Sequence, residues 1–281
     1  MLRTRVITAV ILLAVLLAVL YVNSLSVLTI TVTAFFFAAV WESGRLFDAR
    51  FPLIGAALWA AVLLFLTFGD SAMWPQAHLA PLPPLMLAAI SVATWLIRLG
   101  PSLAIGLPPL KTVGNWLLSF IYCITLLACF VAILVLFQHS ALYLFSVMAL
   151  VWLADIGAYF SGKAFGKRKL APSISPGKSW EGVVGGWLAV VILAGGSTFA
   201  PQLADTFSPH LLAAWGWGGW LAVMTLIVAA SVIGDLFESQ LKRRIGMKDS
   251  SNLLPGHGGV LDRIDALIPV LPLAVLCGQW M

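Results

Sequence analysis

The sequence predicts an all-α, polytopic integral membrane protein of about nine transmembrane helices with a cytoplasmic N-terminus. Hydrophobic residues make up 61% of the 281 positions and charged residues only 10%, and the mean hydropathy is +1.02. Soluble globular domains carry about 25% charged residues, so this composition excludes a soluble globule. Apolar runs near the length that crosses a bilayer, about 17–25 residues, recur at 6–22, 25–41, 53–69, 82–98, 114–137, 140–160, 183–200, 211–234 and 265–280.

The boundaries of these runs are not equally well marked. A single helix over 114–160 would be roughly 70 Å long at 1.5 Å per residue, and the polar triplet Gln-His-Ser at 138–140 divides it. We therefore expect two helices joined in a tight hairpin. The fourth and ninth runs are short and contain prolines, so their ends are weakly defined. Arg3 and Arg5 precede the first run without a small-residue cleavage site after it, which favours a retained helix over a signal peptide.

The basic residues are distributed on one side of the predicted membrane protein. With nine helices, all 16 Lys and Arg residues fall at the N-terminus or in alternate connections. The opposite loops contain no Lys or Arg, and their titratable residues are Asp70, Asp205, His78, His139 and His210. By the positive-inside rule the basic side is cytoplasmic, and the C-terminus lies outside. The net charge of +5 therefore indicates topology and attraction to anionic lipid rather than nucleic-acid binding.

Composition also divides the chain near residue 110. Residues 1–110 are predicted to form a scaffold of transmembrane helices with few polar side chains. The segment 99–113 is rich in glycine and proline, which predicts a connecting loop. Residues 111–281 are predicted to form the functional transmembrane domain, because they carry two polar cytoplasmic loops, at 161–182 and 235–265.

Several residues within the apolar runs are expected to be structural. Glu42 stands beside Arg45, which predicts an ion pair at the membrane interface. Cys123, Cys129 and Cys277 lie inside apolar runs and lack the spacing of metal ligands. We expect these cysteines to pack as small apolar side chains.

The first polar loop, 161–182, predicts contact with a phosphate. It interleaves basic residues with hydroxyls and glycines, and Ser175, Lys178 and Ser179 are its candidate ligands. Cations, short donors and an approachable backbone are what an anionic phosphate requires. A nucleotide P-loop is excluded because a proline stands where that motif needs glycine. Asp155, near the end of the preceding run, is an additional candidate polar site, because a carboxylate there needs a cavity or a lysine partner.

Carboxylates gather at both ends of the second polar loop. If the preceding helix continues, Asp235, Glu238 and Ser239 are spaced i, i+3 and i+4 and share one face. Asp262 and Asp265 share a face at the start of the last run. Hard oxygen ligands suit Mg²⁺, which proteins hold with one or two carboxylates plus substrate phosphates. A metal site is the favoured interpretation. The alternative is a set of salt bridges to the neighbouring basic residues Lys242, Arg243 and Arg263.

A glycine-flanked histidine lies between these carboxylates. Gly256, Gly258 and Gly259 remove side chains on both sides of His257. Backbone amides and the imidazole are thereby expected to approach a phosphate or a base closely.

Residues 239–265 resemble the signature of the phosphatidate cytidylyltransferase (CDP-diglyceride synthetase) family. That pattern combines a serine, an aliphatic residue, Lys-Arg, Lys-Asp, Pro-x-His-Gly-Gly and a closing Asp-Arg-aliphatic-Asp. The positions that fill it are Ser239, Leu241, Lys242, Arg243, Lys248, Asp249, Ser251, Leu254, Pro255, His257, Gly258, Gly259, Asp262, Arg263, Ile264 and Asp265. The helix of Asp155 and the loop from Ser175 to Gly182 also resemble the family, so the likeness covers about residues 150–265.

The resemblance implies a reaction of phospholipid biosynthesis, in which CTP and phosphatidate give CDP-diacylglycerol and pyrophosphate with Mg²⁺. It also implies a homodimer, a second, monovalent cation such as K⁺, and a bacterial cytoplasmic (inner) membrane location with the active site facing the cytoplasm. The implied metal ligands are Asp235, Asp262 and Asp265, to which Lys242 and His257 are added as catalytic residues. The implied contacts to CTP or phosphate are Ser175, Lys178, Ser179, Ser239, Lys242, Arg243, Lys248, Asp249, His257, Gly258, Gly259 and Arg263.

Two other functions remain open at this point. Another CTP-dependent membrane lipid cytidylyltransferase, or a lipid kinase, would use the same carboxylates with a different acceptor. An ion-coupled transporter would also contain carboxylates in apolar helices, although transporters usually place them near the membrane midplane. Here the charges lie toward one face and join two loops, which favours an enzyme.

Overall fold

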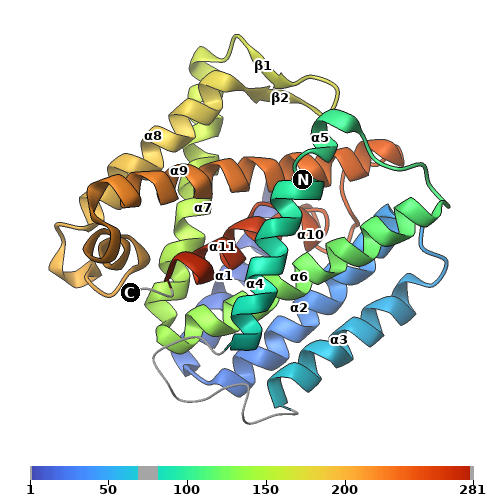
Figure 1. Ribbon diagram of the computed structural model, residues 1–281, viewed down its shortest axis with the longest axis horizontal. Coiled ribbons are helices and arrows are strands. Elements are labelled where there is room, and N and C mark those ends of the chain that lie inside the picture. The colour runs from blue at the N-terminus through green and yellow to red at the C-terminus, as the bar shows by residue number, and fades with distance from the viewer. Residues whose placement is uncertain (1, 69–81, 279–281) are drawn as a thin grey trace.

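The computed structural model describes residues 2–68 and 82–278, so the predictions for Asp70 and His78 lie outside the described residues. The described chain is nearly all helical, with one small β-hairpin (Figure 1). Its elements in order are α1 (Leu2–Val22), α2 (Leu25–Leu46), α3 (Pro52–Phe68), α4 (Leu82–Thr94), the π-turn η2 (Trp95–Leu99), α5 (Ser102–Ile105), α6 (Val113–His139), α7 (Ala141–Phe165), β1 (Lys169–Ala171), β2 (Ser175–Ser179), α8 (Trp180–Ser197), the 3₁₀ turn η3 (Pro201–Leu203), α9 (Phe207–Arg244), α10 (Leu261–Ile264) and α11 (Leu267–Gly278).

Six helices in the described part of the chain are long and apolar enough to cross a membrane. They are α2, the helical stretch Pro83–Ile105, α6, α7, α8 and α9. Two further apolar helices, α3 and α11, are shorter. The protein is therefore a multi-pass membrane protein by the length and composition of its helices.

The predicted hairpin in the middle of the chain is confirmed. α6 ends at His139 and α7 begins at Ala141, so a single residue separates the two helices. Ser140 caps α7, because its Oγ accepts a hydrogen bond from the backbone N–H of Tyr143 at 3.0 Å. The polar triplet thus ends one helix and begins the next.

The first polar loop contains a short β-hairpin, which is the one departure from the predicted all-α class among the described residues. α7 continues to Phe165, and strands β1 and β2 then form an antiparallel hairpin that leads directly into α8. Figure 1 shows α7 and α8 side by side below this hairpin. Their close approach depends on small residues: a Cβ on Gly157 would lie 2.7 Å from the Cβ of Ala189 and 3.0 Å from the Cα of Gly186.

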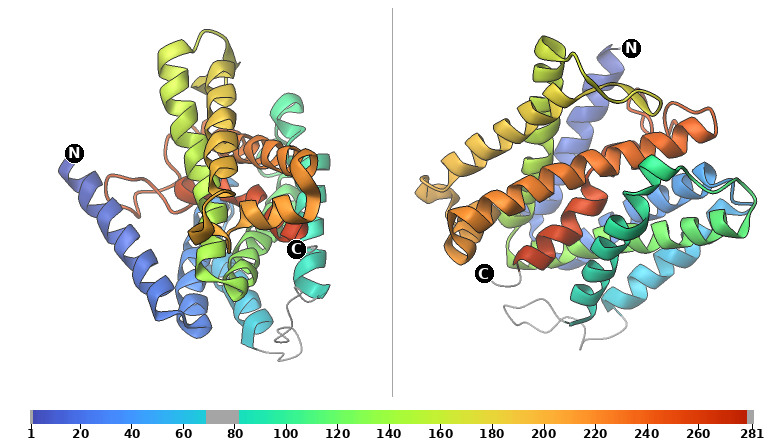
Figure 2. Two further views of the ribbon diagram at one scale, coloured as in Figure 1. Left: turned by 90° about the vertical axis from the view of Figure 1, so that its left-hand side faces the viewer. Right: turned by 45° about the horizontal axis from the view of Figure 1, so that its top comes forward.

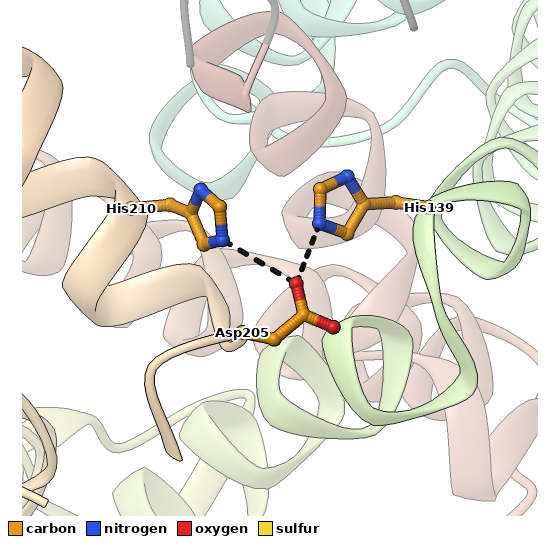
Figure 3. A group of neighbouring side chains, drawn as sticks. All are labelled: His139, Asp205 and His210. Carbon is orange, nitrogen blue, oxygen red and sulfur yellow. Dashed lines mark hydrogen bonds and ion pairs between the residues drawn. The ribbon is translucent and has the colours of Figure 1, made fainter. Parts of the chain in front are cut away.

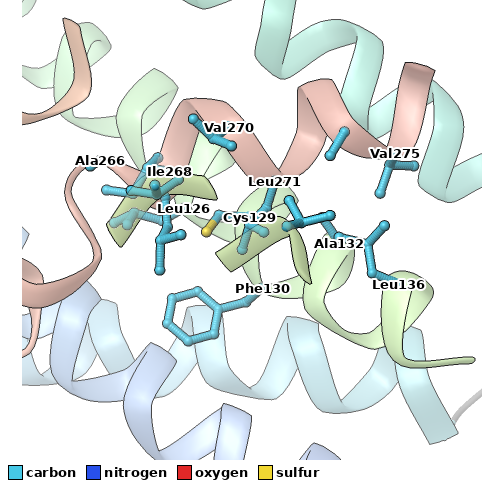
Figure 4. Close-up of a cluster of buried hydrophobic side chains, with 14 of the residues drawn as sticks. Leu126, Cys129, Phe130, Ala132, Leu136, Ala266, Ile268, Val270, Leu271 and Val275 are labelled. Atoms are coloured by element: carbon cyan, nitrogen blue, oxygen red, sulfur yellow. The ribbon is translucent and has the colours of Figure 1, made fainter. Parts of the chain in front are cut away.

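The apolar core is built around α6, which packs against α2, α4, α7 and α11. Figure 4 shows the contact with α11, where Cys129 and Phe130 lie among aliphatic side chains of both helices. All three cysteines are buried and free, as predicted from their apolar surroundings. A second cluster of aromatic rings joins Trp95 of η2, Tyr122 of α6 and Phe237 of α9, with ring centroids 5.2–6.4 Å apart.

α9 crosses the body of the molecule and contacts α7, α8 and α11 (Figures 1 and 2). Its 38 residues are interrupted at Gly216, where φ is 62° and ψ is 179°. A side chain at this positive φ would be strained, so glycine permits the break. The aromatic cluster around Phe237 fixes the C-terminal half of α9 against α6. α1, in contrast, leans away from the other helices at its N-terminal end (Figure 2).

Candidate functional site

The C-terminal end of α9 carries the first half of the site. Because α9 continues unbroken from Gly216 to Arg244, Asp235, Glu238, Ser239 and Lys242 recur at i, i+3, i+4 and i+7 on one face. Ser239 Oγ donates to Asp235 Oδ1 at 3.3 Å. The conditional prediction that the helix extends past residue 234 is therefore confirmed.

Lys242 joins this face of α9 to α10. Its ammonium group pairs with Glu238 Oε2 and donates to Asp262 Oδ1 at 2.6 Å. The three side chains are only 10%, 0% and 5% exposed, respectively. Lys242 therefore links a buried carboxyl group of α9 to a buried carboxylate of α10, and removing it would leave both groups without their shared partner. The salt-bridge interpretation is correct for this lysine.

The second oxygen of Asp262 organises the loop between α9 and α10. Asp262 Oδ2 accepts hydrogen bonds from the backbone N–H of Gly259 at 2.7 Å and from the backbone N–H and Oγ of Ser250 at 2.9 and 3.0 Å. Burial acts to raise the pKa of Asp262, but the bonds from Lys242, Gly259 and Ser250 outweigh it and lower the pKa below its usual value. Asp262 is therefore held as a carboxylate.

Glu42 of α2 supports the same loop from the other side, and sequence reasoning missed it. Its carboxylate is fully buried and accepts four hydrogen bonds. The donors are Ser251 Oγ at 2.5 Å, the backbone N–H groups of Val260 at 3.1 Å and Leu261 at 2.6 Å, and Ser250 Oγ at 3.2 Å, whose single proton is shared with Asp262 Oδ2. No local pattern could reveal these partners, because they lie more than 200 residues away along the chain.

The expected ion pair between Glu42 and Arg45 is wrong. The Arg45 guanidinium lies over the Trp41 ring at 5.1 Å and donates to the carbonyl of Ser250 at 3.5 Å. Both residues therefore belong to the contact between α2 and the second polar loop rather than to an isolated interfacial pair.

The glycines beside His257 are also required by the packing of the loop itself. A Cβ on Gly259 would lie 2.0 Å from Ser250 Oγ and 2.5 Å from Glu42 Oε1. Gly258 has a φ of +83°, and its Cβ would lie 2.6 Å from Asp262 Oδ2. In this structure the glycines make room for the protein's own carboxylates.

Lys178 and Asp235 meet at a cavity of about 460 Å³ between α7, α8, α9 and the β-hairpin. Lys178 Nζ lies 2.5 Å from Asp235 Oδ2. The cavity is also lined by Asp155, Ser175 and Ser179, together with apolar residues of the three helices. The structure thus brings Ser175, Lys178 and Ser179, the phosphate ligands predicted from the first polar loop, close to Asp235 of α9.

The hydroxyl of Ser179 has a structural role at the start of α8. It caps α8 by accepting a hydrogen bond from the backbone N–H of Gly182 at 3.2 Å, and the residue is 4% exposed. Ser175 lies at the start of β2, where its backbone pairs with Ala171.

Lys248 and Asp249 line a separate cavity of about 490 Å³ at the surface, together with Trp41, Arg45 and Ser251. Both charged side chains are exposed. The cavity lies at the contact between α2 and the second polar loop.

The arginines of the signature bind backbone carbonyls. Arg263 donates to the carbonyl of His257 through Nε at 3.2 Å and through Nη2 at 2.7 Å. Arg243 donates to the carbonyl of Ile174, which ties α9 to the β-hairpin. Hydrogen bonds to carbonyls leave the positive charges uncompensated by carboxylates, so these groups retain attraction for an anionic ligand.

Arg244 is a further anchor that sequence reasoning left unassigned. It donates to the carbonyls of Leu46 and Pro108, each at 3.2 Å, and to Asn115 Oδ1 at 2.9 Å. These bonds fasten the end of α9 to the connections that follow α2 and α5.

The carboxylates of this region suit a hard divalent cation, and one of them is incompletely paired. Glu238 Oε1 is buried and has no hydrogen-bond partner. An unpartnered buried carboxylate oxygen is costly, and a bound cation would satisfy it. Asp265 lies beside α9, because a Cβ on Gly234 would meet its carbonyl oxygen at 2.4 Å. Among the described residues, however, Asp235, Asp262 and Asp265 do not bring three ligand atoms within 4.8 Å of one another.

His257 lies half-buried at the edge of the same loop. Its Nδ1 is buried without a hydrogen-bond partner, and its backbone N–H donates to the carbonyl of Leu254 at 2.8 Å. The imidazole is therefore held by its backbone, and its ring nitrogen is left for a ligand.

The fold and site define a class: a helical multi-pass membrane protein whose carboxylates and basic residues meet at the ends of its helices. The sequence model of the cytidylyltransferase family matches residues 3–280, and the chain belongs to that family. It is 36% identical to the phosphatidate cytidylyltransferase of Haemophilus influenzae, over 97% of this chain and 96% of that protein. It is 39% identical to that of Pseudomonas aeruginosa, over 97% of this chain and 95% of that protein. The phosphatidate cytidylyltransferase of Bacillus subtilis matches at 40% over 57% of this chain and 56% of that protein.

Proposed function

We propose that the protein is a phosphatidate cytidylyltransferase, which converts CTP and phosphatidate to CDP-diacylglycerol and pyrophosphate. One observation carries this conclusion. The chain is 36–39% identical over nearly its whole length to two proteins of that name, and the matched range includes every candidate site residue. The reaction supplies a phospholipid precursor, which agrees with the apolar helices on which the site is built.

The orientation of nine spans with the N-terminus in the cytoplasm is part of this proposal. Contacts between loops support it. Hydrogen bonds of Arg45, Arg243 and Arg244 join the loops that follow α2, α5, β1 and α9, all of which the charge pattern assigns to the cytoplasmic side. His139 and Asp205, in contact with each other, come from two connections assigned to the opposite side. The bacterial inner membrane is the corresponding location.

The nucleophile in this reaction is the substrate itself. A phosphomonoester has a second pKa of about 6, so the phosphatidate phosphate is already largely ionised near neutral pH. No serine, cysteine or lysine nucleophile is required. The protein must place a phosphatidate oxygen in line with the α-phosphorus of CTP and stabilise the charge that develops on the leaving pyrophosphate.

The lipid phosphate is assigned to the cavity beside Lys178. This cavity combines Lys178 and Ser175 with an apolar wall from three helices, which is the combination that an anionic headgroup on two acyl chains requires. Occupation by a phosphate would compete with Asp235 for the ammonium of Lys178. The exposed Lys248, together with Arg243 and Arg263, is assigned to the triphosphate, because arginine binds phosphate oxygens in bidentate fashion.

The residues that would hold Mg²⁺ are Asp235, Asp262 and Asp265, and Glu238 joins them because of its unpartnered oxygen. Bound there, the ion would neutralise charge on the phosphates. Lys242 positions two of these carboxylates. A second, monovalent cation such as K⁺ and a homodimeric assembly, both implied by the family signature, are retained as proposals.

Product analysis tests the proposal. Purified protein in detergent, given CTP, diacyl phosphatidate and Mg²⁺, is expected to release pyrophosphate and form a CDP-lipid. Release of CDP would instead identify a lipid kinase, and reaction only with another phospholipid acceptor would identify a different lipid cytidylyltransferase. A transporter requires sealed vesicles, so turnover in detergent separates the two classes. An Asp262→Asn variant serves as the inactive control.

A further inference from the structure

A cluster of two histidines and one aspartate lies far from the site described above. His139 is the last residue of α6, Asp205 lies between η3 and α9, and His210 lies in the first turn of α9. The N-terminal part of α9 that carries His210 is separated from Asp235 by the break at Gly216 and then by about 28 Å of helix, at 1.5 Å per residue. The cluster therefore takes no part in chemistry at Asp235.

The two imidazoles converge on a single carboxylate oxygen. His139 Nε2 lies 3.0 Å from Asp205 Oδ1, and His210 Nε2 lies 3.4 Å from the same atom. Figure 3 shows both rings directed at Asp205 from opposite sides. All three candidate ligand atoms lie within 4.8 Å of one another. Among the described residues, this is the group of three or more His, Cys, Asp or Glu side chains whose ligand atoms lie this close together.

The two nitrogen–oxygen separations, 3.0 and 3.4 Å, match edges of a tetrahedral metal site. Zinc binds histidine nitrogen and carboxylate oxygen at about 2.0–2.1 Å, which places two ligands of a tetrahedron about 3.3 Å apart. Two imidazole nitrogens and one carboxylate oxygen suit Zn²⁺ better than Mg²⁺ or Ca²⁺, which prefer oxygen ligands alone. The three side chains are 43%, 54% and 32% exposed, in the order His139, Asp205 and His210, so solvent could supply a fourth ligand.

The surrounding residues hold the ligands in place. Ser140 Oγ donates to the second oxygen of Asp205 at 2.9 Å, which leaves Oδ1 directed at the imidazoles. The buried ring of Tyr143 packs against both histidines, with centroid distances of 4.3 Å to His139 and 5.8 Å to His210. Support of a ligating carboxylate by a hydroxyl donor is a regular feature of metal sites.

We propose that His139, Asp205 and His210 form a zinc site that fastens the α6–α7 turn to the start of α9. The zinc ion would cross-link the α6–α7 turn and the connection between α8 and α9, on the face opposite the lipid-modifying site. The alternative is a metal-free cluster in which Asp205 accepts a hydrogen bond from each imidazole. The zinc site predicts one bound metal ion per chain, and the metal-free cluster predicts none.

Zinc binding to the full-length protein in detergent provides the test. The protein is stripped with chelator, kept in millimolar Mg²⁺ to saturate the oxygen-rich site, and titrated with Zn²⁺ by calorimetry. We expect one ion per chain. His139→Ala, His210→Ala and Asp205→Asn are each expected to weaken binding by at least about tenfold, the loss that follows even from disturbing residues that only support a metal site. A His257→Ala variant is the matched control, because it removes a histidine elsewhere, and its zinc affinity is expected to match the wild type.

A spectroscopic variant keeps the test decisive where an alanine variant fails to fold. Co²⁺ added to a His139→Cys variant is expected to give a sulfur-to-cobalt charge-transfer band that the wild type lacks, because a thiolate would replace one imidazole as ligand. The proposal is overturned by wild-type protein that takes up no zinc under these conditions. It is equally overturned by zinc affinity that is unchanged in all three ligand variants, or by a His139→Cys variant without the band.

Discussion

Replacing Glu42 by glutamine isolates the contribution of one buried carboxylate to the site. Each oxygen of Glu42 accepts one serine hydroxyl and one backbone N–H, from Val260 on one side and Leu261 on the other. A serine hydroxyl can rotate and accept from the new amide NH₂. A backbone N–H cannot, so either orientation of the glutamine leaves one buried N–H without an acceptor.

The magnitude follows from that single lost acceptor. Leaving one buried donor unsatisfied costs about 1–3 kcal/mol, which is a factor of roughly 5–150 in an equilibrium constant. The affected N–H groups begin the segment that carries Asp262, so we expect the loss to disturb Asp262 directly. kcat/KM for CTP should fall by about tenfold or more in Glu42→Gln, and the midpoint of thermal unfolding should fall with it.

Asp48→Asn is the matched control for Glu42→Gln, because it makes the same chemical change just beyond the end of α2. The carboxylate of Asp48 is 46% exposed and lies 3.9 Å from Lys111, which is 83% exposed. Such surface pairs contribute about 0–1 kcal/mol, so this variant should retain wild-type activity. A Glu42→Gln enzyme with wild-type kcat/KM and an unchanged unfolding midpoint would refute the role assigned to Glu42.

Three other substitutions test the remaining contacts. Asp262→Asn should abolish turnover at every Mg²⁺ concentration, because the asparagine amide would turn N–H groups toward donors that bond to the oxygens of Asp262 in the wild type. Wild-type initial rates would exclude the role assigned to Asp262. Lys242→Ala should lower the free energy of unfolding by about 3–5 kcal/mol, since it leaves two buried carboxylates uncompensated; unchanged stability with only a raised KM for CTP would instead make the lysine a substrate ligand. Gly259→Ala should destabilise the protein by about 1–3 kcal/mol through overpacking against Ser250 and Glu42. In thermal unfolding the matched Gly55→Ala variant, whose Cβ meets no atom within 4 Å, should behave as wild type, and equal midpoints for both variants would contradict the packing.

Local regularity explains what could be predicted from the sequence. The apolar runs predicted the long helices, because the thickness of the membrane fixes the length of a spanning segment. The triplet at 138–140 predicted the α6–α7 hairpin, and the spacing of Asp235, Glu238 and Ser239 predicted one face of α9. The division into residues 1–110 and 111–281 stays a prediction, although the bonds from Glu42 to the second loop join the two parts closely.

Long-range contacts explain what could not be predicted. β2 contains Pro176 and Gly177, residues that disfavour strands, so its pairing with β1 has no signal in its own sequence. The partners of Glu42 and Arg244 depend on the packing of distant segments. Contact of Gly258 and Gly259 with a ligand stays a prediction, whereas their packing against Asp262, Ser250 and Glu42 has no signal in the local sequence.

The fate of the individual phosphates of CTP tests the central claim most directly. Purified protein, phosphatidate and Mg²⁺ are incubated in parallel with CTP labelled at the α-phosphate and with CTP labelled at the γ-phosphate. Attack on the α-phosphorus predicts that the α label moves into the lipid fraction and that the γ label appears in aqueous pyrophosphate. A γ label in the lipid fraction, or no label there from either nucleotide, would contradict cytidylyl transfer to phosphatidate.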